Sequence, residues 1–591
     1  MNEKKTAGYI IPFRRHPLVG LSIFYLCGIW AGLTYTIPLF PVAGIYFLVV
    51  AFICVIYVWN LSRKPSEEGI LRRSSNLLCL ISAFLAAYCV TQLHPLHPRY
   101  SSVMAHHIDF VESMNLSTNS IQLESGTTSE YGIESSGSSQ TGSSKSVVCY
   151  LQGRIVWDPE IYLLSDDNKW LIKFPVRIEK LIVRGHKLPV EGRRINVLMY
   201  SRDSVPNMEY GTRISVKGAL IKNKSADRYD SWKEDYMVRT HSTSSKVLST
   251  GHGDMFLSWC FANRRQSSQY LKTGIEKYPA VSAILRAILL GDDTDMRKEW
   301  KTIFFETGTL HIFAISGLHI AMIASIITVF LGALGIPRTR WILFVGPIII
   351  IYTLATGARA SAIRACIMTI MFLLAPLVKR QFDILSAVAC ASIFITSIDP
   401  SQLRNAGFLM SFICVLGLIA FCPRFEHSMR WATTPDPLQL ETEGRGREMM
   451  RKIAKYFLSL ASAATAGWLA SAPLIAYFFG VVTPVTLIGN LIAVPLAFLV
   501  VLAGCLSIIL GSCCIWFADI FNHANVIIVS TLMWWLDMLR RIPGGTFRIG
   551  EMKLYTVWTI YAILIAVVFV IYLWQSKPNL IINKQQESKS L

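Results

Sequence analysis

The chain has 591 residues, of which 52% are hydrophobic and 16% are charged. Soluble globular proteins carry about 25% charged residues, so this composition excludes an ordinary soluble enzyme or binding domain. The formal net charge of +19 is explained first by lysines and arginines in cytoplasmic loops, and it leaves open a polyanionic partner such as nucleic acid or anionic lipid.

Long apolar runs predict a polytopic α-helical membrane protein. A helix that crosses the hydrocarbon core needs about 20 residues, and about twelve runs are candidates on that basis. They lie at 18–37, 40–59, 75–93, 309–334, 341–357, 361–378, 383–398, 405–422, 457–479, 484–510, 514–534 and 556–574. The first run follows a basic start and precedes a second apolar run, which indicates a retained anchor rather than a cleaved signal peptide.

The short loops predict how the protein is oriented, because basic loops stay in the cytoplasm. This rule places both termini in the cytoplasm and residues 94–250 outside it. One segment does not fit this orientation, because twelve spans would place the basic stretch 539–553 outside the cytoplasm. The predicted location is the cytoplasmic (inner or plasma) membrane, crossed many times.

Changes of composition along the chain predict six regions. They are about three N-terminal membrane helices (1–93), a flexible Ser/Gly-rich extracytoplasmic segment (94–146), an OB-like β domain (147–250), amphipathic interfacial helices (251–308), a membrane core (309–534), and an outer basic segment with the last membrane helix and a cytoplasmic tail (535–591). The Ser/Gly-rich segment has little to bury, so we expect a solvated tether.

The third region contains short runs rich in β-branched and aromatic residues, such as "SVVCYLQGRIVW" and "KWLIKFPVRIEKLIV". Four or five such strands suit a small barrel, of which the OB-fold is one candidate. Cations that meet phosphates, beside aromatic rings that stack on bases, are typical of single-strand binders. Interleaved acids keep the net charge of this region modest. The candidate nucleic-acid contacts are Arg154, Trp157, Trp170, Lys173 and Arg177.

The stretch "HIFAISGLHIAMIA" (311–324) carries polar side chains in an apolar run, and ionisable groups within a membrane indicate function. A serine enzyme is disfavoured, because Ala314 breaks the GxSG pattern and no orienting acid is near. His311 and His319 lie about 12 Å apart on a regular helix, too far to share a metal. The thirteen cysteines lie mostly in apolar runs without zinc-site spacing, and no GxxxxGK[ST] loop occurs. We therefore predict no catalytic residue, no metal and no cofactor.

Two further stretches carry isolated polar groups. Arg359 and Arg364 are five residues apart on a predicted helix, so their directions differ by about 140°. At least one should face an interior cavity or the outer mouth; the alternatives are snorkelling for Arg359 and a structural pair for Arg364. Asn490 stands between two prolines in an apolar run, and such a broken helix with a lone amide is typical of a substrate path.

Together these stretches resemble the ComEC competence proteins, a family thought to conduct single-stranded DNA into transformable bacteria. The most characteristic block is "ILLGDDTDMRKEWKTIFFETGTLHIFAISGLHIAMIA", followed by "LATGARASAIRACIM", "DPSQLRNAGFLMSF" and "SAPLIAYFFGVVTPVTLIGNLIAVPLAF". Matching positions are His311, Ser316, Gly317, His319, Gly357, Arg359, Arg364, Ala365, Pro473, Asn490 and Pro495. Leu409 and Met410 replace the usual Gln-Leu of the third block.

The resemblance implies a membrane channel for single-stranded DNA in natural transformation. Its DNA path candidates are His311, Ser316, Gly317, His319, Arg359, Arg364 and Asn490. Longer members carry a metallo-β-lactamase-like domain; the HxHxDH pattern is missing here, so we expect no nuclease activity. The implied partners are membrane lipids, a cytoplasmic helicase-like ATPase, single-strand-binding proteins, an external DNA receptor and a separate nuclease, and a homo-oligomer is left open.

Two other hypotheses remain. The chain could transport another anionic polymer or a lipid-linked envelope precursor, because a polar path for such a substrate would look similar. It could also be an interaction or scaffold protein, in which case the polar membrane residues would not affect uptake.

Overall fold

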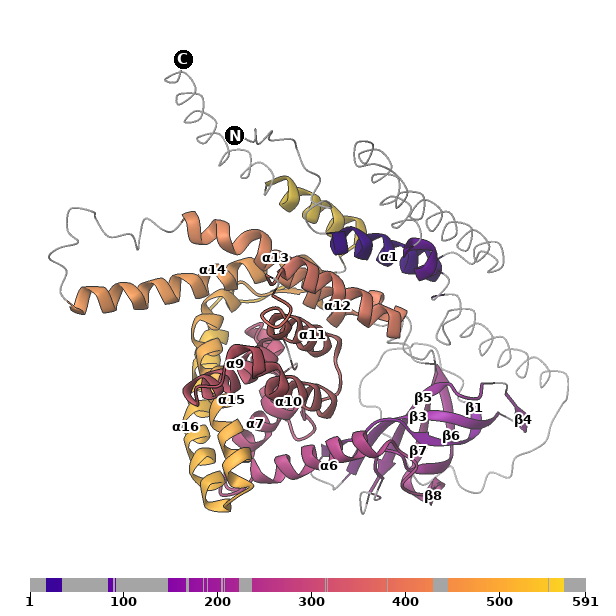
Figure 1. Ribbon diagram of the computed structural model, residues 1–591. Coiled ribbons are helices and arrows are strands. Elements are labelled where there is room, and N and C mark those ends of the chain that lie inside the picture. The colour runs from indigo at the N-terminus through magenta and orange to yellow at the C-terminus, as the bar shows by residue number, and fades with distance from the viewer. Residues whose placement is uncertain are drawn as a thin grey trace. The chain divides into compact units, whose positions relative to one another are not determined.

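The computed structural model describes most of the chain from residue 147 onward and two short N-terminal pieces (Figure 1). The described residues are 17–34, 83–88, 91, 147–165, 169–183, 185–188, 190–202, 206, 208–222, 236–313, 315, 317–379, 381–428, 445–550 and 552–567. The predicted span 40–59, the Ser/Gly-rich segment 94–146 and Ser316 lie outside these residues. The chain forms two compact units, one of residues 1–263 with 396–404 and one of the remainder.

The first unit contains the N-terminal helix and a β-barrel. Helix α1 (Pro17–Thr34) packs near the 3-10 turn η6 (Pro400–Arg404), and the hydroxyls of Tyr25 and Ser397 lie 2.6 Å apart. The strands are β1 (Val147–Ile155), β2 (Glu160–Ser165), β3 (Lys169–Val183), β4 (His186–Lys187), β5 (Arg194–Ser201), β6 (Arg213–Lys222), β7 (Tyr236–His241) and β8 (Ser245–Ser249).

Five of these strands close on themselves. Their order is β1-β3-β5-β7-β6, and β6 pairs again with β1. All pairs in the ring are antiparallel except β5 with β7, which is parallel. A closed five-stranded barrel is the architecture expected of an OB-like domain.

Alternation along the strands builds the barrel core. In β1 the buried residues alternate with exposed or half-buried ones over Val147–Ile155, as a strand with one face inward requires. The same alternation in β5 turns Ile195, Val197 and Met199 inward. At Gly153 the pairing of β1 with β3 shifts, and a Cβ there would meet the backbone of Arg177. A glycine is needed at this point because the backbones of β1 and β3 approach each other closely.

The second unit is helical. Its elements run from α6 (Met255–Tyr270), which begins in the first unit, to α16. The others are α7 (Pro279–Leu290), α8 (Lys298–Glu306), η4 (Leu310–Ile312), α9 (Gly317–Ala333), η5 (Arg338–Arg340), α10 (Trp341–Ala355), α11 (Ala360–Leu374), α12 (Ile384–Ile398), α13 (Ala406–Ser428), α14 (Arg445–Phe479), α15 (Thr486–Gly511) and α16 (Ile515–Arg540), with a short pair of β9 (Val481–Val482) and β10 (Phe547–Arg548).

Among the described residues, five helical segments are long and apolar enough to cross a membrane, by length and composition. They are Arg338–Ala355, Ala406–Ser428, Met449–Phe479, Thr486–Gly511 and Ile515–Arg540. Shorter apolar helices include α9, α11 and α12. The chain is thus a helical membrane protein with an OB-like domain, and the count of about twelve spans stays a prediction.

Helix α7 is packed more deeply than a helix on the membrane face would be. Every residue from Val281 to Leu290 is buried, and α7 contacts both α15 and α16. Leu289 fits against Gly504 of α15, where a Cβ would collide with it. The apolar residues that suggested an interfacial helix therefore contribute to the core of the helical unit.

Candidate functional site

The apolar segment that carries the two histidines is interrupted. Backbone after α8 turns at Gly308, whose φ of 67° suits glycine. The 3-10 turn η4 follows, and the regular helix α9 begins only at Gly317. His311 is exposed, and its Nδ1 lies 3.1 Å from the carbonyl oxygen of Gly308. His319 is buried on α9, with 3% of its surface exposed.

Four buried threonines surround the turn at Gly308. The hydroxyls of Thr307 and Thr309 lie 2.8 Å apart. Thr486 Oγ1 donates to the carbonyl of Thr307 at 2.9 Å and lies 2.9 Å from Thr483 Oγ1. A side chain at residue 308 would collide with both hydroxyls on the α15 side. These bonds satisfy the irregular backbone within the apolar unit and tie the interrupted segment to the start of α15.

Arg364 on α11 is the main charged group of the site. Only 6% of its surface is exposed, and its Cζ lies 5.7 Å from the ring centre of Phe412 on α13. Its Nη2 lies 3.0 Å from the position a Cβ would take on Gly317. Within the described residues, its buried Nε and Nη1 have no hydrogen-bond partner. No carboxylate of the described part of the chain forms an ion pair with it.

The start of α11 is held against the interrupted segment. Ser361 Oγ donates to the carbonyl oxygen of Ile315 at 2.9 Å. Before it, Gly357 and Ala358 have φ values of 108° and 45°, which makes the tight turn that ends α10. Arg359 follows this turn as an exposed residue at the helix start. The backbone therefore brings Arg364 to the first turn of α9.

The predicted path residues do not all meet. The contacts among described residues join Gly317 to Arg364 but give none that joins Arg359 or Asn490 to this pair. Asn490 is half-buried on α15, one turn after Thr486, and its buried Oδ1 has no hydrogen-bond partner among the described residues. It continues the polar face that Thr486 begins.

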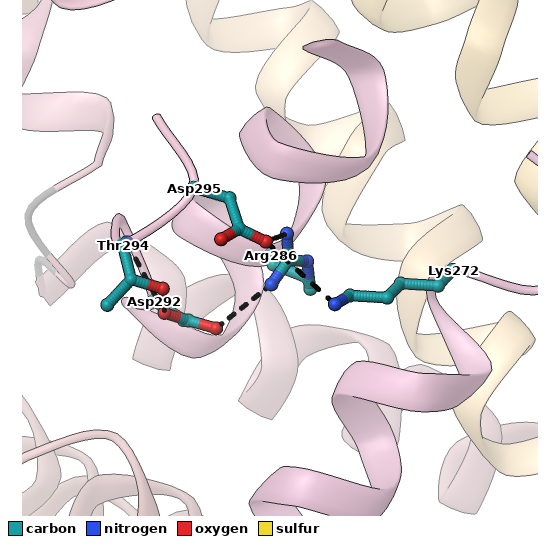
Figure 2. A network of polar contacts seen from close by, with 5 residues as sticks. All are labelled: Lys272, Arg286, Asp292, Thr294 and Asp295. Carbon is teal, nitrogen blue, oxygen red and sulfur yellow. Dashed lines mark hydrogen bonds and ion pairs between the residues drawn. The ribbon is translucent and has the colours of Figure 1, made fainter. Parts of the chain in front are cut away.

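A second buried arginine, Arg286 on α7, was not among the predicted site residues (Figure 2). Its Nη1 lies 3.2 Å from Asp292 Oδ2, and its Nη2 pairs with Asp295. Lys272 Nζ lies 3.8 Å from the same carboxylate of Asp295. The cue in the sequence is the acidic run "GDDTD" directly after an apolar helix with one arginine.

This network fixes the loop after α7. Burial raises the pKa of Asp292, but the hydrogen bonds from Thr294 and the charge of Arg286 outweigh it, so the pKa lies below its usual value. Thr294 Oγ1 donates to Asp292 Oδ1 at 2.6 Å. The loop next to it is held by Lys301 and Asp293, 2.7 Å apart. Arg286 is therefore a compensated charge.

The β domain places its candidate contacts in different surroundings. Arg154 and Arg177 lie directly opposite each other on β1 and β3. Lys173 lies 3.9 Å from Glu160. The ring of Trp157 packs edge-on against Phe261, with ring centres 4.9 Å apart. Trp170 stands at the start of β3, opposite Leu163 and Ser201.

The part of the chain that the structure describes contains no group of three or more His, Cys, Asp or Glu residues placed to hold a metal. In the β domain, Cys149 is buried, and burial raises the pKa of its thiol from 9.0 to about 12. The helical site offers a buried positive charge at Arg364 and a cluster of buried hydroxyl groups at the turn of Gly308.

Residues 288–576 match the Competence protein family. The chain is 30% identical over 141 residues to ComE operon protein 3 of Bacillus subtilis (strain 168), an alignment that covers 24% of this chain and 18% of the relative. It is 28% identical over 176 residues to the uncharacterized protein YcaI of Escherichia coli (strain K12), which covers 28% of this chain and 23% of the relative. The matched part is thus less than a quarter of either relative. No solved structure matches the chain.

Proposed function

Because residues 288–576 belong to the Competence protein family, we propose that this membrane protein conducts single-stranded DNA across the cytoplasmic membrane in natural transformation. The β domain lies outside the cytoplasm in this proposal, with both termini inside. The moving strand contacts the polar groups of the interrupted segment, His311, Ser316 and His319, together with Arg359, Arg364 and Asn490.

The observation that carries the proposal is the uncompensated charge of Arg364. Removing an ion from water into a protein interior costs several kcal/mol, which a nearby carboxylate usually offsets. Arg364 is 6% exposed and has no such partner among the described residues. A phosphate group that passes the site would supply the missing negative charge. Charged residues buried within membrane proteins are commonly retained for such a role.

The backbone at this place favours an anion as well. Helix α9 begins at Gly317, beside the guanidinium of Arg364. The first N–H groups of a helix have no partner within the helix and carry a partial positive charge, so they attract phosphate. A conducting site must attract each phosphate and then release it. One guanidinium with a helix N-terminus fits that requirement better than a cluster of arginines would.

The source of energy lies outside this chain in the proposal. The sequence has no GxxxxGK[ST] loop, which would cradle a nucleotide. A cytoplasmic helicase-like ATPase and single-strand-binding proteins would pull the strand inward, and an external receptor would deliver it.

Uptake of labelled duplex DNA by the native host tests the proposal. Label protected in the cytosol is counted separately from label outside the membrane. Loss of one hydrogen-bonded charge contact of about 1.5–3 kcal/mol predicts that Arg364→Met lowers the cytosolic pool about tenfold or more. The external pool should be unchanged. Arg340→Met, which removes an exposed arginine at the start of α10, is the matched control.

Two results would contradict the proposal. Arg364→Met could support normal uptake at normal protein levels, and then the guanidinium has no phosphate to meet. A competent host without this protein could also fill its cytosolic pool normally. That outcome would favour a transporter for another anionic polymer or a lipid-linked envelope precursor.

A further inference from the structure

Four arginines stand in one line across the barrel. Arg154 on β1 lies opposite Arg177 on β3 and, on its other side, opposite Arg213 on β6. Arg177 in turn lies opposite Arg194 on β5. We name these four residues the arginine row. Neighbouring strands are about 4.8 Å apart, so the row extends about 14 Å at right angles to the strands.

All four side chains are on the outer face of the barrel. Residues directly opposite each other on antiparallel strands share a face. Next to the row, Ile155, Ile195 and Ile214 are buried in the barrel core, and alternation therefore turns the arginines outward. Arg177 and Arg194 are exposed, and the other two are half-buried.

The row is only partly neutralised. Arg213 Nε lies 2.6 Å from Glu179 Oε2, and Arg154 Nη1 donates to the carbonyl of His252 at 2.7 Å. In the contacts of the described residues, neither Arg177 nor Arg194 meets a carboxylate. Like charges directly opposite each other destabilise a sheet. An external anion with several charges that lies along the row would relieve this repulsion.

The surroundings of the row indicate which anion it takes. On one side of the row Gln152 lies opposite Ser215, and on the other side Pro175 lies opposite Asn196. None of these four is a large apolar side chain that would enter a lipid surface. An extended polymer with regularly spaced phosphates suits a line of guanidinium groups, each of which can form paired hydrogen bonds with phosphate oxygens.

The row itself consists of arginines only, and no aromatic ring belongs to it. Trp157 packs against Phe261. Trp170 is seven residues before Arg177 on β3, about 23 Å along the strand. Tyr150 is exposed on the same face of β1 as Arg154, but it is four residues away, about 13 Å along the strand, and its hydroxyl lies 2.8 Å from Ser215 Oγ. The guanidinium groups are therefore the nearest contacts for a ligand on the row.

We propose that the arginine row binds consecutive phosphates of one nucleic-acid strand, which crosses β5, β3, β1 and β6 and is held by its backbone rather than its bases. Arg194 and Arg213, which were not among the predicted contacts, complete the site. Binding at the row requires no passage through the membrane, so it can hold whether or not the helical unit conducts DNA.

The test measures binding by the purified full-length protein in nanodiscs of uncharged lipid. The probe is a fluorescent oligothymidylate of about 16 nucleotides, the upper end of the site size for one OB domain. Its affinity is measured against salt concentration, since each lost phosphate contact lowers the slope of log K against log salt by about 0.7 for a single strand. The variant is the double substitution Arg177→Gln with Arg194→Gln.

The double variant should bind more weakly, with a slope smaller by about 1.4, and an abasic strand of equal length should bind wild type as well as the oligothymidylate does. The double substitution Arg177→Lys with Arg194→Lys should restore most of the slope. Arg239→Gln is the matched control: Arg239 is exposed on β7 and level with Leu198, which is about 13 Å along β5 from Arg194. This control should leave the slope unchanged.

An unchanged slope in the Arg177→Gln, Arg194→Gln variant would overturn the proposal, as would much weaker binding of the abasic strand. If the row mediates binding to anionic vesicles while the oligonucleotide does not bind, the ligand is a lipid surface and the proposal is wrong. The Arg364→Met variant should bind the oligonucleotide normally, which separates failure at the row from failure of the crossing step.

Discussion

Two arginines are buried to almost the same degree in the helical unit, and they differ in what surrounds them. Arg286 is 4% exposed and pairs with Asp292 and Asp295. Arg364 is 6% exposed and, among the described residues, meets the ring of Phe412 but no carboxylate. The buried fraction of an arginine therefore does not by itself show whether its charge is neutralised by the protein. The first arginine is part of the fold, and the second is the charge that meets a ligand in our proposal.

Arg286→Met should strongly destabilise the protein, because it leaves the carboxylate of Asp292 without its buried partner. Breaking a buried pair from one side costs about 3–5 kcal/mol. Thermal unfolding in detergent should show a large fall in midpoint and a poor yield of folded protein. Adding Asp292→Asn and Asp295→Asn removes the unpaired charges and should restore much of the loss. If Arg286→Met alone unfolds like wild type, the two arginines are not distinct in the way described.

Arg364→Met should have the opposite effect on stability. Replacing buried charges with apolar groups of similar volume is often neutral or stabilising by about 1–4 kcal/mol. Its unfolding midpoint should therefore be equal to or above that of wild type even though uptake is lost. A marked destabilisation would indicate that Arg364 has a structural partner, and the comparison with Arg286 would no longer hold.

Gly317→Ala should move the guanidinium of Arg364 without removing it. The new Cβ would lie 3.0 Å from Arg364 Nη2 and 3.3 Å from Ala365 Cβ, which is tight. A gain in helix propensity of up to about 1 kcal/mol offsets part of this strain, so we expect little change in the unfolding midpoint and a several-fold loss of uptake.

Gly332→Ala is the matched control on the same helix. Its new Cβ would meet only the ring of Trp341, at 3.8 Å. Uptake by this variant should equal that of wild type. Equal uptake by both alanine variants would show that the position of the guanidinium beside Gly317 does not matter.

Cys149 is a buried group that, unlike an arginine, can stay neutral by keeping its proton. Burial raises the pKa of its thiol from 9.0 to about 12, so the folded state keeps the proton while the unfolded state loses it. The contribution of this pKa shift to the free energy of unfolding is fully present below about pH 9. It is lost as the pH rises toward 12, by up to about 1.4 kcal/mol per pH unit. Unfolding midpoints of wild type and Cys149→Ala should therefore converge as the pH is raised from about 8 to 10. Parallel curves would contradict the assigned burial.

Part of this architecture follows from local pattern. The strands of the barrel were predicted from short runs of β-branched and aromatic residues, because that signal lies within a few neighbouring residues. The register that aligns Arg154 with Arg213 depends on strands far apart in the sequence, so the arginine row was not predicted. The partners of Arg286, and the absence of a carboxylate paired with Arg364 among the described residues, depend on how helices pack, which periodicity alone does not give.

The closure of the barrel also affects how the domain is made. Val147 at the beginning of β1 pairs with Leu220 near the end of β6, and β7 ends at His241. The ring can close only after about 95 residues have been synthesised, which takes about 5–20 s at typical rates of translation. During that time β1 lacks its second partner until β6 is made, and β5 lacks its second partner until β7 is made. Such unpaired edges can pair with other chains. Each molecule therefore passes through a period in which its unfinished β domain is exposed to aggregation, and this period ends when β7 pairs with β5 and β6.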